Sequence, residues 1–358
     1  MYPIKFTPCY KDYIWGGRNL EKFGKKLPEG IVAESWEISC HPDGMGIVSN
    51  GKYKGMTFQE LLDKHFHEVM GDTPSQTYIS GKHSHPKFPL LVKFIDAEDR
   101  LSVQVHPDDE YAFAHENGEL GKKEMWYILD AKPGAKLIYD VAPGTTREIF
   151  AEAVKNGTIS QYLNVVEVAK GDVVNIPAGI VHAIGEGIVI AEIQQNSNTT
   201  YRVYDYDRIG KDGKKRPLHI EKAIDVINFN SGIKNAKSQG LKVSLDKNSF
   251  KTYYIANKYF SVELYEVSGK IEEDMENRFC IFIFIEGEAI IESNKEQVNA
   301  VQGESLLMPA AIGKYIIKGQ FKALKAYIPD ITRDIIEPLE KAGYSKEKIY
   351  NSISGLEA

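Results

Sequence analysis

The sequence predicts a mainly β protein of two related β-barrels, with helical insertions and a helical extension at the C-terminus. Three observations carry this prediction. The composition is globular and rich in aromatic residues that favour strands, with 42% hydrophobic residues, 20 Tyr and 15 Phe. Short Val- and Ile-rich runs recur between Gly and Pro residues, which is typical of barrels and sandwiches. A glycine–proline pattern also occurs twice along the 358 residues, a length sufficient for two domains.

Strand and helix signals alternate along the first part of the chain. Residues 87–105 contain two apolar runs separated by a polar turn at 96–100, which predicts a hairpin or a pair of adjacent strands. A brief strand is expected at 126–129, and short strands return over 164–193. Three segments with helix-start signals or helical spacing are expected to be helical insertions, at about 108–120, 145–163 and 218–229.

The second part of the chain returns to strands after a polar stretch at 230–240, which we interpret as a domain boundary. Strands are expected at 251–255, 260–267, 279–284 and 289–292. The tail is charged, with apolar residues at helical spacing. The sequence therefore predicts three units: a domain over 1–235, a second domain over 240–330, and a helical extension over 331–358.

Composition and charge exclude several classes of function. The formal net charge of -6 argues against a dedicated nucleic-acid-binding protein, although a local basic pocket for an anion is compatible with it. Three widely spaced cysteines, Cys9, Cys40 and Cys280, form neither a disulfide framework nor a CxxC metal motif. Residues 1–5 lack the apolar core of a signal peptide, and the apolar run 279–285 is too short to span a bilayer. We expect a cytoplasmic protein without nucleic-acid or membrane partners.

The repeated pattern begins at Gly171, with five residues before Pro177, then Gly179 and His182. It resembles the second motif of the cupin superfamily of small jelly-roll barrels, in which the histidine projects into the barrel. The pattern returns 132 positions later, from Gly303 to Pro309. In this second copy Ala311 replaces the second glycine, and Lys314 stands at the position of the histidine. The second barrel is therefore expected to lack the metal ligands of the first.

Four polar residues of the first domain form a candidate metal site. Gln104 and His106 stand two apart at the end of a predicted strand, so their side chains share a face. His182 comes from the cupin-like motif, and Glu124 lies between them in the sequence. Two imidazoles, a carboxylate and an amide oxygen suit zinc, with positions left open for water or substrate. The pairs His65/His67 and His83/His85 lack strand context and are expected to be surface histidines.

Seven segments occur in an order that resembles a known enzyme family. They are Trp15-Gly16-Gly17, Glu34-Ser35-Trp36-Glu37, Leu91-Val92-Lys93, Ser102-Val103-Gln104-Val105-His106-Pro107, Glu124-Met125-Trp126-Tyr127, Pro177-Ala178-Gly179 with His182, and Tyr201-Arg202-Val203-Tyr204-Asp205. Together they resemble the short bacterial form of the type I mannose-6-phosphate isomerases, over roughly residues 1–330. The resemblance implies reversible interconversion of mannose 6-phosphate and fructose 6-phosphate through a cis-enediol, with one zinc ion per chain.

The resemblance also implies roles for individual residues. It places the zinc ligands at Gln104, His106, Glu124 and His182, the catalytic arginine at Arg202 and a catalytic lysine at Lys122. Substrate-binding positions fall on Lys93, Trp15, Glu34 and Glu192. Two positions depart from the family pattern, because larger relatives carry Tyr at Ile184 and many carry Asp at Asn198. The general base stays open between Lys122, Glu192, Glu34 and a water held by the metal.

Alternatives remain at this point. The basic segment 211–216 is either a solvated hairpin turn or a loop that steers or caps the sugar phosphate. Two histidines and one carboxylate also match the iron triad of oxygenases, so a different metal-dependent cupin enzyme, such as a dioxygenase or an epimerase, is one competing function. The other is a non-catalytic cupin that binds a sugar phosphate as a sensor.

Overall fold

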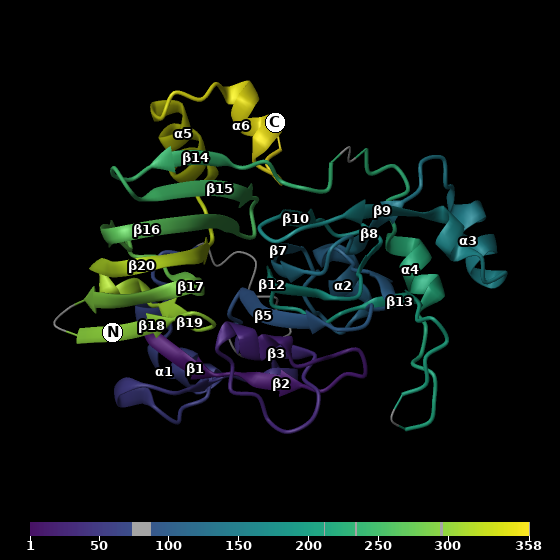
Figure 1. The fold of residues 1–358 in the computed structure, drawn as a ribbon, viewed down its shortest axis with the longest axis horizontal. Helices are drawn as coiled ribbons and strands as arrows, with labels where there is room; N and C mark the ends of the chain where they lie inside the picture. Colours follow the sequence, from purple (N-terminus) through teal and green to yellow (C-terminus); the bar gives the residue numbers. More distant parts are fainter. Residues whose placement is uncertain (74–86, 211, 233–234, 294–295, 358) are drawn as a thin grey trace.

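A computed structural model describes the chain except for residues 74–86, 211, 233–234, 294–295 and 358. Two sheets built from the first part of the chain face each other (Figure 1). The six-stranded sheet has the order β10 (Val173–Ile176), β7 (Glu124–Ala131), β12 (Ile188–Gln195), β5 (Leu90–Ala97), β3 (Glu34–Ile38) and β2 (Cys9–Lys11). The five-stranded sheet has the order β13 (Tyr201–Tyr204), β6 (Val103–Val105), β11 (His182–Ile184), β8 (Lys136–Val141) and β9 (Leu163–Glu167). Their inner faces share one apolar core, to which Ile128 and Ile190 contribute from one side and Leu137 and Ile184 from the other.

A nine-stranded sheet forms the second part of the molecule. Its order is β14 (Leu241–Ser244), β15 (Phe250–Ala256), β16 (Ser261–Asp274), β20 (Lys314–Tyr327), β17 (Cys280–Ser293), β19 (Ser305–Met308), β1 (Ile4–Thr7) and β4 (Ile47–Val48), with β18 (Glu296–Val301) paired to β17. The three long strands β16, β20 and β17 meet at Gly269, Gly319 and Ala289. A side chain at Gly319 would place its Cβ 2.2 Å from the carbonyl oxygen of Glu288, so glycine is required where the strands pass closest.

Strand order confirms the internal repeat that the sequence predicted. The order β10-β7-β12-β5-β3-β2 in the six-stranded sheet is matched by β19-β17-β20-β16-β15-β14 in the nine-stranded sheet. Both copies even shift register at the same place, between Trp36 and Ile38 in β3 and between Tyr253 and Ile255 in β15. The described pairings leave the sheets as open paths, so each copy is an open jelly roll of facing layers instead of a closed barrel.

The register corrects one position of the predicted repeat. His182 lies opposite Gln104 in the first copy, and in the second copy Tyr315 lies opposite Glu273. The counterpart of His182 is therefore Tyr315 and not Lys314. The shift arises because a 3-10 turn, η5 (Ala310–Ile312), followed by Gly313, adds one residue before β20 begins.

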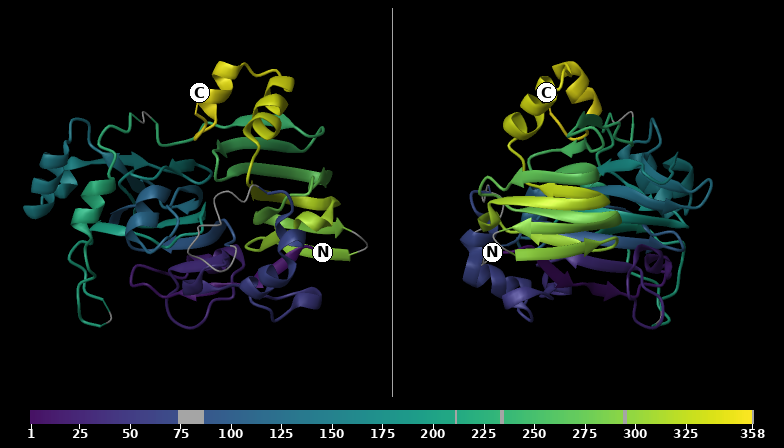
Figure 2. Two further views of the ribbon diagram at one scale, coloured as in Figure 1. Left: turned by 180° about the vertical axis from the view of Figure 1, so that it is seen from behind. Right: turned by 60° about the vertical axis from the view of Figure 1, so that its left-hand side comes forward.

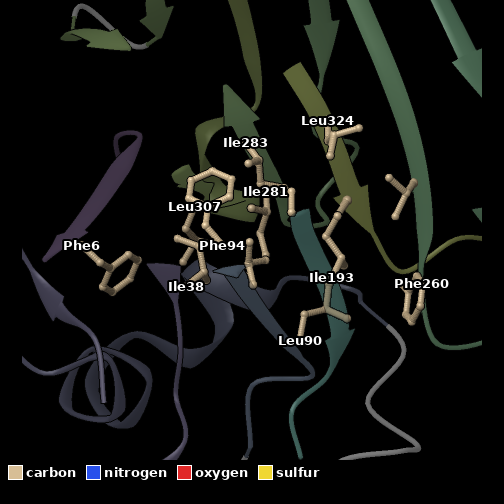
Figure 3. Close-up of a cluster of buried hydrophobic side chains, with 14 of the residues drawn as sticks. Phe6, Ile38, Leu90, Phe94, Ile193, Phe260, Ile281, Ile283, Leu307 and Leu324 are labelled. Carbon is tan, nitrogen blue, oxygen red and sulfur yellow. The ribbon is translucent and has the colours of Figure 1, made fainter. Parts of the chain in front are cut away.

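A large apolar cluster joins the two parts of the molecule. Leu90 and Phe94 of β5 and Ile193 of β12 point away from the core between the first two sheets and pack toward Ile281 and Leu324 of the nine-stranded sheet (Figure 3). All eight residues of β5 are consequently buried, since one face lines the first jelly roll and the other lines this junction. Burial on both faces explains the continuous apolar run in the sequence.

Three helical insertions lie within the predicted ranges: α2 (Asp109–His115), α3 (Arg147–Lys155) and α4 (Ile220–Val226). The single helix predicted over 145–163 is wrong beyond Lys155, because Gly157 interrupts it and a 3-10 turn, η4 (Ile159–Tyr162), leads directly into β9. The helix α1 (Phe58–Met70) was not predicted; it begins at a capping box formed by Thr57 and Glu60. Shorter 3-10 turns lie at η1 (Asn19–Phe23), η2 (Pro42–Gly44) and η3 (Gly51–Tyr53).

The C-terminal extension is helical, as predicted. It contains η6 (Ile331–Ile336), α5 (Glu337–Lys341) and α6 (Lys346–Ser352), which lie beside β14 and β15 at the outer edge of the nine-stranded sheet (Figure 2). Ile335, Leu339 and Ile349 share one core with Leu241 and Tyr253 of those strands. The extension therefore covers the apolar side of a sheet edge.

Two expectations about the chain's organisation need comment. The two strands predicted over 87–105 are present as β5 and β6, but they form neither a hairpin nor an adjacent pair, because they belong to facing sheets. The N-terminal strands β1 and β4 join the nine-stranded sheet, where β1 pairs with β19. The predicted domain boundaries thus remain a prediction, with residues from both predicted domains sharing one sheet. None of the described helices combines the length and apolar character needed to cross a membrane.

Candidate metal and active site

Three metal-ligating side chains converge between the first two sheets. His106 follows β6 and His182 begins β11, whereas Glu124 begins β7 on the opposite sheet. The Nε2 atoms of His106 and His182 lie 3.5 and 3.3 Å from the two carboxylate oxygens of Glu124. One ligand atom from each residue lies within 4.8 Å of those of the others, and all three side chains are buried. The structure therefore brings together three of the four metal ligands that the sequence predicts, in a group that could hold a metal ion.

Both imidazoles are oriented by backbone carbonyls. The Nδ1 atom of His106 lies 2.9 Å from the carbonyl oxygen of Thr199, and that of His182 lies 2.8 Å from the carbonyl oxygen of Ile180. When each Nδ1 donates its proton there, the Nε2 lone pairs face Glu124 and are free to bind a metal. Burial and the neighbouring Lys122 ammonium lower the pKa of His106 to about 3, and burial lowers the pKa of His182. Both rings are therefore neutral at pH 7, as metal ligation requires.

The carboxylate of Glu124 supplies the strongest sign of a cation site. It is fully buried, and neither oxygen accepts a hydrogen bond of good geometry. Although burial alone would raise the pKa of Glu124, the Lys122 ammonium and the two histidines hold it well below the usual value. A buried ionised carboxylate facing two imidazole lone pairs fits a divalent metal ion.

Gln104 and Lys122 complete the surroundings of these three ligands. The amide nitrogen of Gln104 lies 3.4 Å from Nε2 of His182, and a half-turn of the amide would present its oxygen to the same point. The ammonium of Lys122 lies 2.9 Å from a carboxylate oxygen of Glu124 and 3.1 Å from Nε2 of His106. Both predicted residues therefore contact the ligand cluster.

A second polar layer lies next to this cluster on the six-stranded sheet. The ammonium of Lys93 lies 3.2 Å from a carboxylate oxygen of Glu192 and 3.7 Å from one of Glu34, and all three residues are buried. Burial opposes the charge on Lys93, but the two carboxylates raise its pKa above the ordinary value. Burial and the nearby charge of Glu124 raise the pKa of Glu192. Lys93 therefore keeps its charge, and Glu192 binds a proton more readily than an ordinary glutamate does.

Arg202 lies in one row with the ligands on the five-stranded sheet. It is the cross-strand neighbour of Gln104, which in turn lies opposite His182, so the three side chains share a face. Its guanidinium donates to the Ser102 hydroxyl at 3.2 Å and to the Pro217 carbonyl at 3.0 Å. Burial and the neighbouring Arg216 lower the pKa of Arg202, although the group stays charged.

Trp15 lies in the apolar core between the first two sheets, 3% exposed, together with Trp126. Its described surroundings are apolar side chains of that core and the ring of Tyr13, whose centroid lies 5.6 Å away. The structure thus places Trp15 in the apolar core between the first two sheets, and the substrate-binding role that the resemblance implies for it stays a prediction.

Several residues of the site were missed by sequence reasoning. Trp36 donates to Glu34 at 2.6 Å, and Trp126 donates to Glu192 at 3.2 Å. Gln194 lies directly opposite Glu124 in the sheet and has a buried amide oxygen without a hydrogen bond. The available signal was strand alternation, because Trp36, Trp126 and Gln194 each stand two positions after a residue already identified and therefore share its face.

The remaining candidates of the sequence lie away from the cluster. His65 is an ion-pair partner of Glu68 on α1, at 3.2 Å, and His67 is exposed, as expected of surface residues. His83 and His85 lie outside the described residues. Ile184 packs in the apolar core, and Asn198 donates to Asp43 at the surface, at 2.9 Å.

The described part of the basic segment forms a turn at the rim of the site. Ile209 and Lys215 pair across it, and Arg216 bonds Asp205 at 2.6 and 2.8 Å. This geometry agrees with the hairpin turn, one of the two interpretations that the sequence left open. Whether the turn also contacts a phosphate stays a prediction.

Comparisons with known proteins agree with this arrangement. Residues 4–129 match the family model of the catalytic domain of type I phosphomannose isomerase, and residues 249–328 match that of the mannose-6-phosphate isomerase cupin domain. The chain is 38% identical to the mannose-6-phosphate isomerase ManA of Bacillus subtilis over 326 residues, which cover 91% of this chain and 99% of the relative. It is 37% identical to the mannose-6-phosphate isomerase of Streptococcus mutans over 319 residues, 88% of this chain and 94% of the relative.

Solved structures give the same result. A crystal structure of the mannose 6-phosphate isomerase from Bacillus subtilis superposes with a TM-score of 0.82 at 34% identity, over 92% of this chain and all of that one. A structure from Archaeoglobus fulgidus, at 24% identity and a TM-score of 0.71, shares the fold. The cupin-type fold is thus confirmed, and the chain belongs to the type I mannose-6-phosphate isomerase family.

Proposed function

We propose that the protein is a zinc-dependent aldose–ketose isomerase that interconverts mannose 6-phosphate and fructose 6-phosphate through a cis-enediol. The observation that carries the proposal is the buried cluster of His106, His182 and Glu124, in which neither carboxylate oxygen of Glu124 accepts a hydrogen bond of good geometry. The names of the relatives supply the substrate. A cytoplasmic location stays a prediction from the sequence.

The metal would be held by His106, His182, Glu124 and the amide oxygen of Gln104. Two imidazoles with a carboxylate and an amide favour zinc, bound once per chain. When bound, the ion supplies a Lewis acid that polarises the two vicinal oxygens of the sugar.

The isomerisation moves a proton between C1 and C2, and another proton between the two oxygens. A C–H beside a carbonyl is a weak acid, so the site must stabilise the negative charge of the enediolate. We assign that task to Arg202, whose guanidinium stays charged and lies in the same row as Gln104 and His182. Its bonds to Ser102 and Pro217 hold the guanidinium in place before substrate arrives.

Proton transfer is assigned to Lys122. It is a buried amine whose nitrogen lies within 3.1 Å of a ligand atom of both His106 and Glu124. Lys93, Glu34 and Glu192 form the polar wall that binds sugar hydroxyls, and Trp15 packs behind that wall. Glu192 is the alternative base, since its pKa is raised by burial and by Glu124.

A coupled assay starting from mannose 6-phosphate, with and without chelator, tests the function. We expect turnover that chelation abolishes and that zinc restores, with about one zinc per chain by elemental analysis. Stoichiometric iron with oxygen uptake would instead support an oxygenase. Fully zinc-loaded protein without turnover would refute the isomerase and favour a sugar-phosphate sensor.

The pH profile then separates the two candidate bases. Lys122→Met should retain zinc and lose turnover at every pH, whereas Glu192→Gln should keep measurable turnover with a raised KM. The opposite pattern would move the base to Glu192.

A further inference from the structure

The second domain repeats the polar wall of the active site with every charge reversed. Strand register assigns the counterparts, since Trp36 lies opposite Lys93 and Tyr253 lies opposite Glu263, next to the same register shift. The positively charged position of the wall becomes acidic, and its two acidic positions become lysines. The pairs are Lys93 with Glu263, Glu34 with Lys251, and Glu192 with Lys325.

The metal-binding positions have changed in a related way. Glu124 lies opposite Ile176 in β10, and Cys280 lies opposite Met308 at the matching place in β19. Gln104 and His182 are replaced by Glu273 and Tyr315, as the register shows. The counterparts are thus a thiol, a carboxylate and a phenol.

The ammonium of Lys325 lies among these three groups. It bonds the carboxylate of Glu273, to which Tyr265 also donates, at 2.6 Å. The side chains of Lys325 and Glu273 are half-buried, with 15% and 16% of their surface exposed. Although burial opposes the charge of Lys325, the carboxylates raise its pKa. A built-in cation therefore stands where the first domain gathers its metal ligands.

A cavity of about 280 Å3 opens onto this cluster. Lys251, Glu263 and Lys325 line its inner side. Its outer wall includes Asp334 of the C-terminal extension, which Arg278 holds by two bonds of 2.7 and 3.1 Å. The volume lies just below the range of ~300–1,000 Å3 typical of small-molecule pockets, so the occupant must be small.

The charges that line the cavity indicate what it would bind. Each of its four cations has a carboxylate partner: Lys325 bonds Glu273, Lys251 lies 3.4 Å from Glu263, and Arg278 and Arg333 both bond Asp334. A phosphate would therefore have to break an existing ion pair. Hydrogen-bonding capacity remains, however, which favours a neutral ligand rich in hydroxyl groups.

Two buried atoms have hydrogen-bonding capacity that the protein does not use. Glu263 is 1% exposed, and its Oε1 accepts from Tyr327 at 2.7 Å, but its Oε2 accepts no hydrogen bond. The Nε of Arg278 likewise donates no hydrogen bond. One acceptor and one donor, both enclosed and both on residues that line the cavity, suit adjacent hydroxyls of a polyol.

We propose that this cavity is a second small-molecule site, which binds a neutral polyhydroxy compound of hexose size, a free hexose or a hexitol, without converting it. The bound molecule touches a fixed ammonium in place of a metal, so the site recognises and does not catalyse. The C-terminal extension completes its wall, which gives that segment a role beyond covering a sheet edge.

Hydrogen–deuterium exchange of the metal-loaded, full-length protein tests the proposal, with D-mannitol, D-mannose and mannose 6-phosphate as probes. Mannitol or mannose should slow exchange in peptides covering 263–280 and 325–338. Mannose 6-phosphate should protect 90–106 and 182–202, whether or not the second site exists. The two sites are thus scored separately, and failure of one does not imply failure of the other.

A matched pair of variants sharpens the result. Glu263→Gln keeps the size of the side chain and its bond to Tyr327 but replaces Oε2, the carboxylate oxygen that lies 3.4 Å from Lys251 and accepts no hydrogen bond. The mannitol concentration needed for half-maximal protection should rise at least tenfold. Glu266→Gln, on the same strand but outside the cavity, should leave it unchanged. If neither polyol protects the second-domain peptides of the wild-type protein at saturation, or if both variants behave alike, the proposal is wrong.

Discussion

Replacing Lys93 by Met tests whether the buried charges of the active-site wall hold one another in place. The Lys93 ammonium stands between Glu192 at 3.2 Å and Glu34 at 3.7 Å, and all three side chains are nearly inaccessible to solvent. Met preserves most of the length and apolar stem of the side chain. The variant therefore removes the charge while changing the packing little.

The expected loss follows from leaving two carboxylates without their cation. Breaking a buried ion pair costs about 3–5 kcal/mol, far more than an exposed pair contributes. At roughly 2–4 °C per kcal/mol for a unit of 150–250 residues, the Tm should fall by about 6–20 °C. The bonds from Trp126 to Glu192 and from Trp36 to Glu34 remain, so the fold itself should persist.

The sign of the pH dependence follows from Glu192. Burial and Glu124 already raise its pKa in the folded protein, and without Lys93 the pKa rises further. Below the ordinary pKa near 4.5 the carboxyl is protonated in both the folded and unfolded states and no penalty remains. Above the raised pKa it is charged in both states and the full penalty applies. The deficit of Lys93→Met should therefore be larger at pH 8 than at pH 5.

Calorimetry of metal-free protein at both pH values measures the deficit. The double variant Lys93→Met, Glu192→Gln should recover part of the lost Tm, because it removes the stranded charge that lay closer to Lys93 and leaves that of Glu34. Lys242→Met, which breaks an exposed pair with Glu266, should change the free energy of unfolding by less than about 1 kcal/mol. A single variant as stable as wild type at pH 8, or a deficit that grows toward pH 5, would refute the reasoning.

Four further expectations follow. Glu124→Gln should reduce bound metal to background in elemental analysis, since it removes the anionic ligand of the cluster. Arg202→Lys should retain the metal but lower kcat by about 10²–10³, measured in the coupled assay, because one ammonium cannot reproduce the fork of donors. Leu324→Ala should cost about 2–5 kcal/mol by opening a cavity in the junction core, measured by thermal unfolding against wild type. Metal-free protein should lose stability as pH falls from about 6.5 toward 3, because in this range His106 is protonated in the unfolded chain but stays neutral in the folded protein. A pH titration of Tm checks this.

Features that depend on local backbone geometry were visible in the sequence. Gly171 and Gly303 both adopt positive φ, at 93° and 83°, where other residues are strained. A Cβ at Gly303 would also lie 1.8 Å from the carbonyl oxygen of Phe23. The positive φ at both glycines is a local property of the backbone, whereas the contact of Gly303 with Phe23 depends on the fold. The spacing of the glycine–proline motif was sufficient to predict the repeat. His106 and His182 were found in the same way, from alternation along a strand and from the motif.

Features that depend on pairing between distant segments were not visible. Gln194 lies opposite Glu124 only because β12 pairs with β7 in a particular register. Likewise, β1 pairs with β19 although most of the chain separates the two strands in the sequence. Counting from the proline of the second motif likewise selected Lys314, one residue short of Tyr315, because η5 changes the spacing. Alternation along β7 and β12 indicates that Trp126 and Gln194 share a face with Glu124 and Glu192, but not which residues of the neighbouring strand they meet.

The reversed charges of the second domain have a physical explanation in the same distinction. Apolar residues at fixed positions, such as Val92 and Val262 at the junction, determine strand order and register in both copies. A buried charge must be paired with an opposite charge, and reversing all three signs keeps the attraction between the central residue and its two partners, although the sign of the net charge of the triad changes. The scaffold therefore constrains the pairing of opposite charges and not the sign at each position. Metal binding, in contrast, does constrain which residue stands at each position. A site whose imidazole and carboxylate ligands are replaced by a phenol and a thiol, next to a lysine ammonium, would no longer bind the metal ion. The copy that kept Glu124 and its histidines kept the metal chemistry, while the copy with Lys325 was free to keep a cavity and recognise a ligand without it.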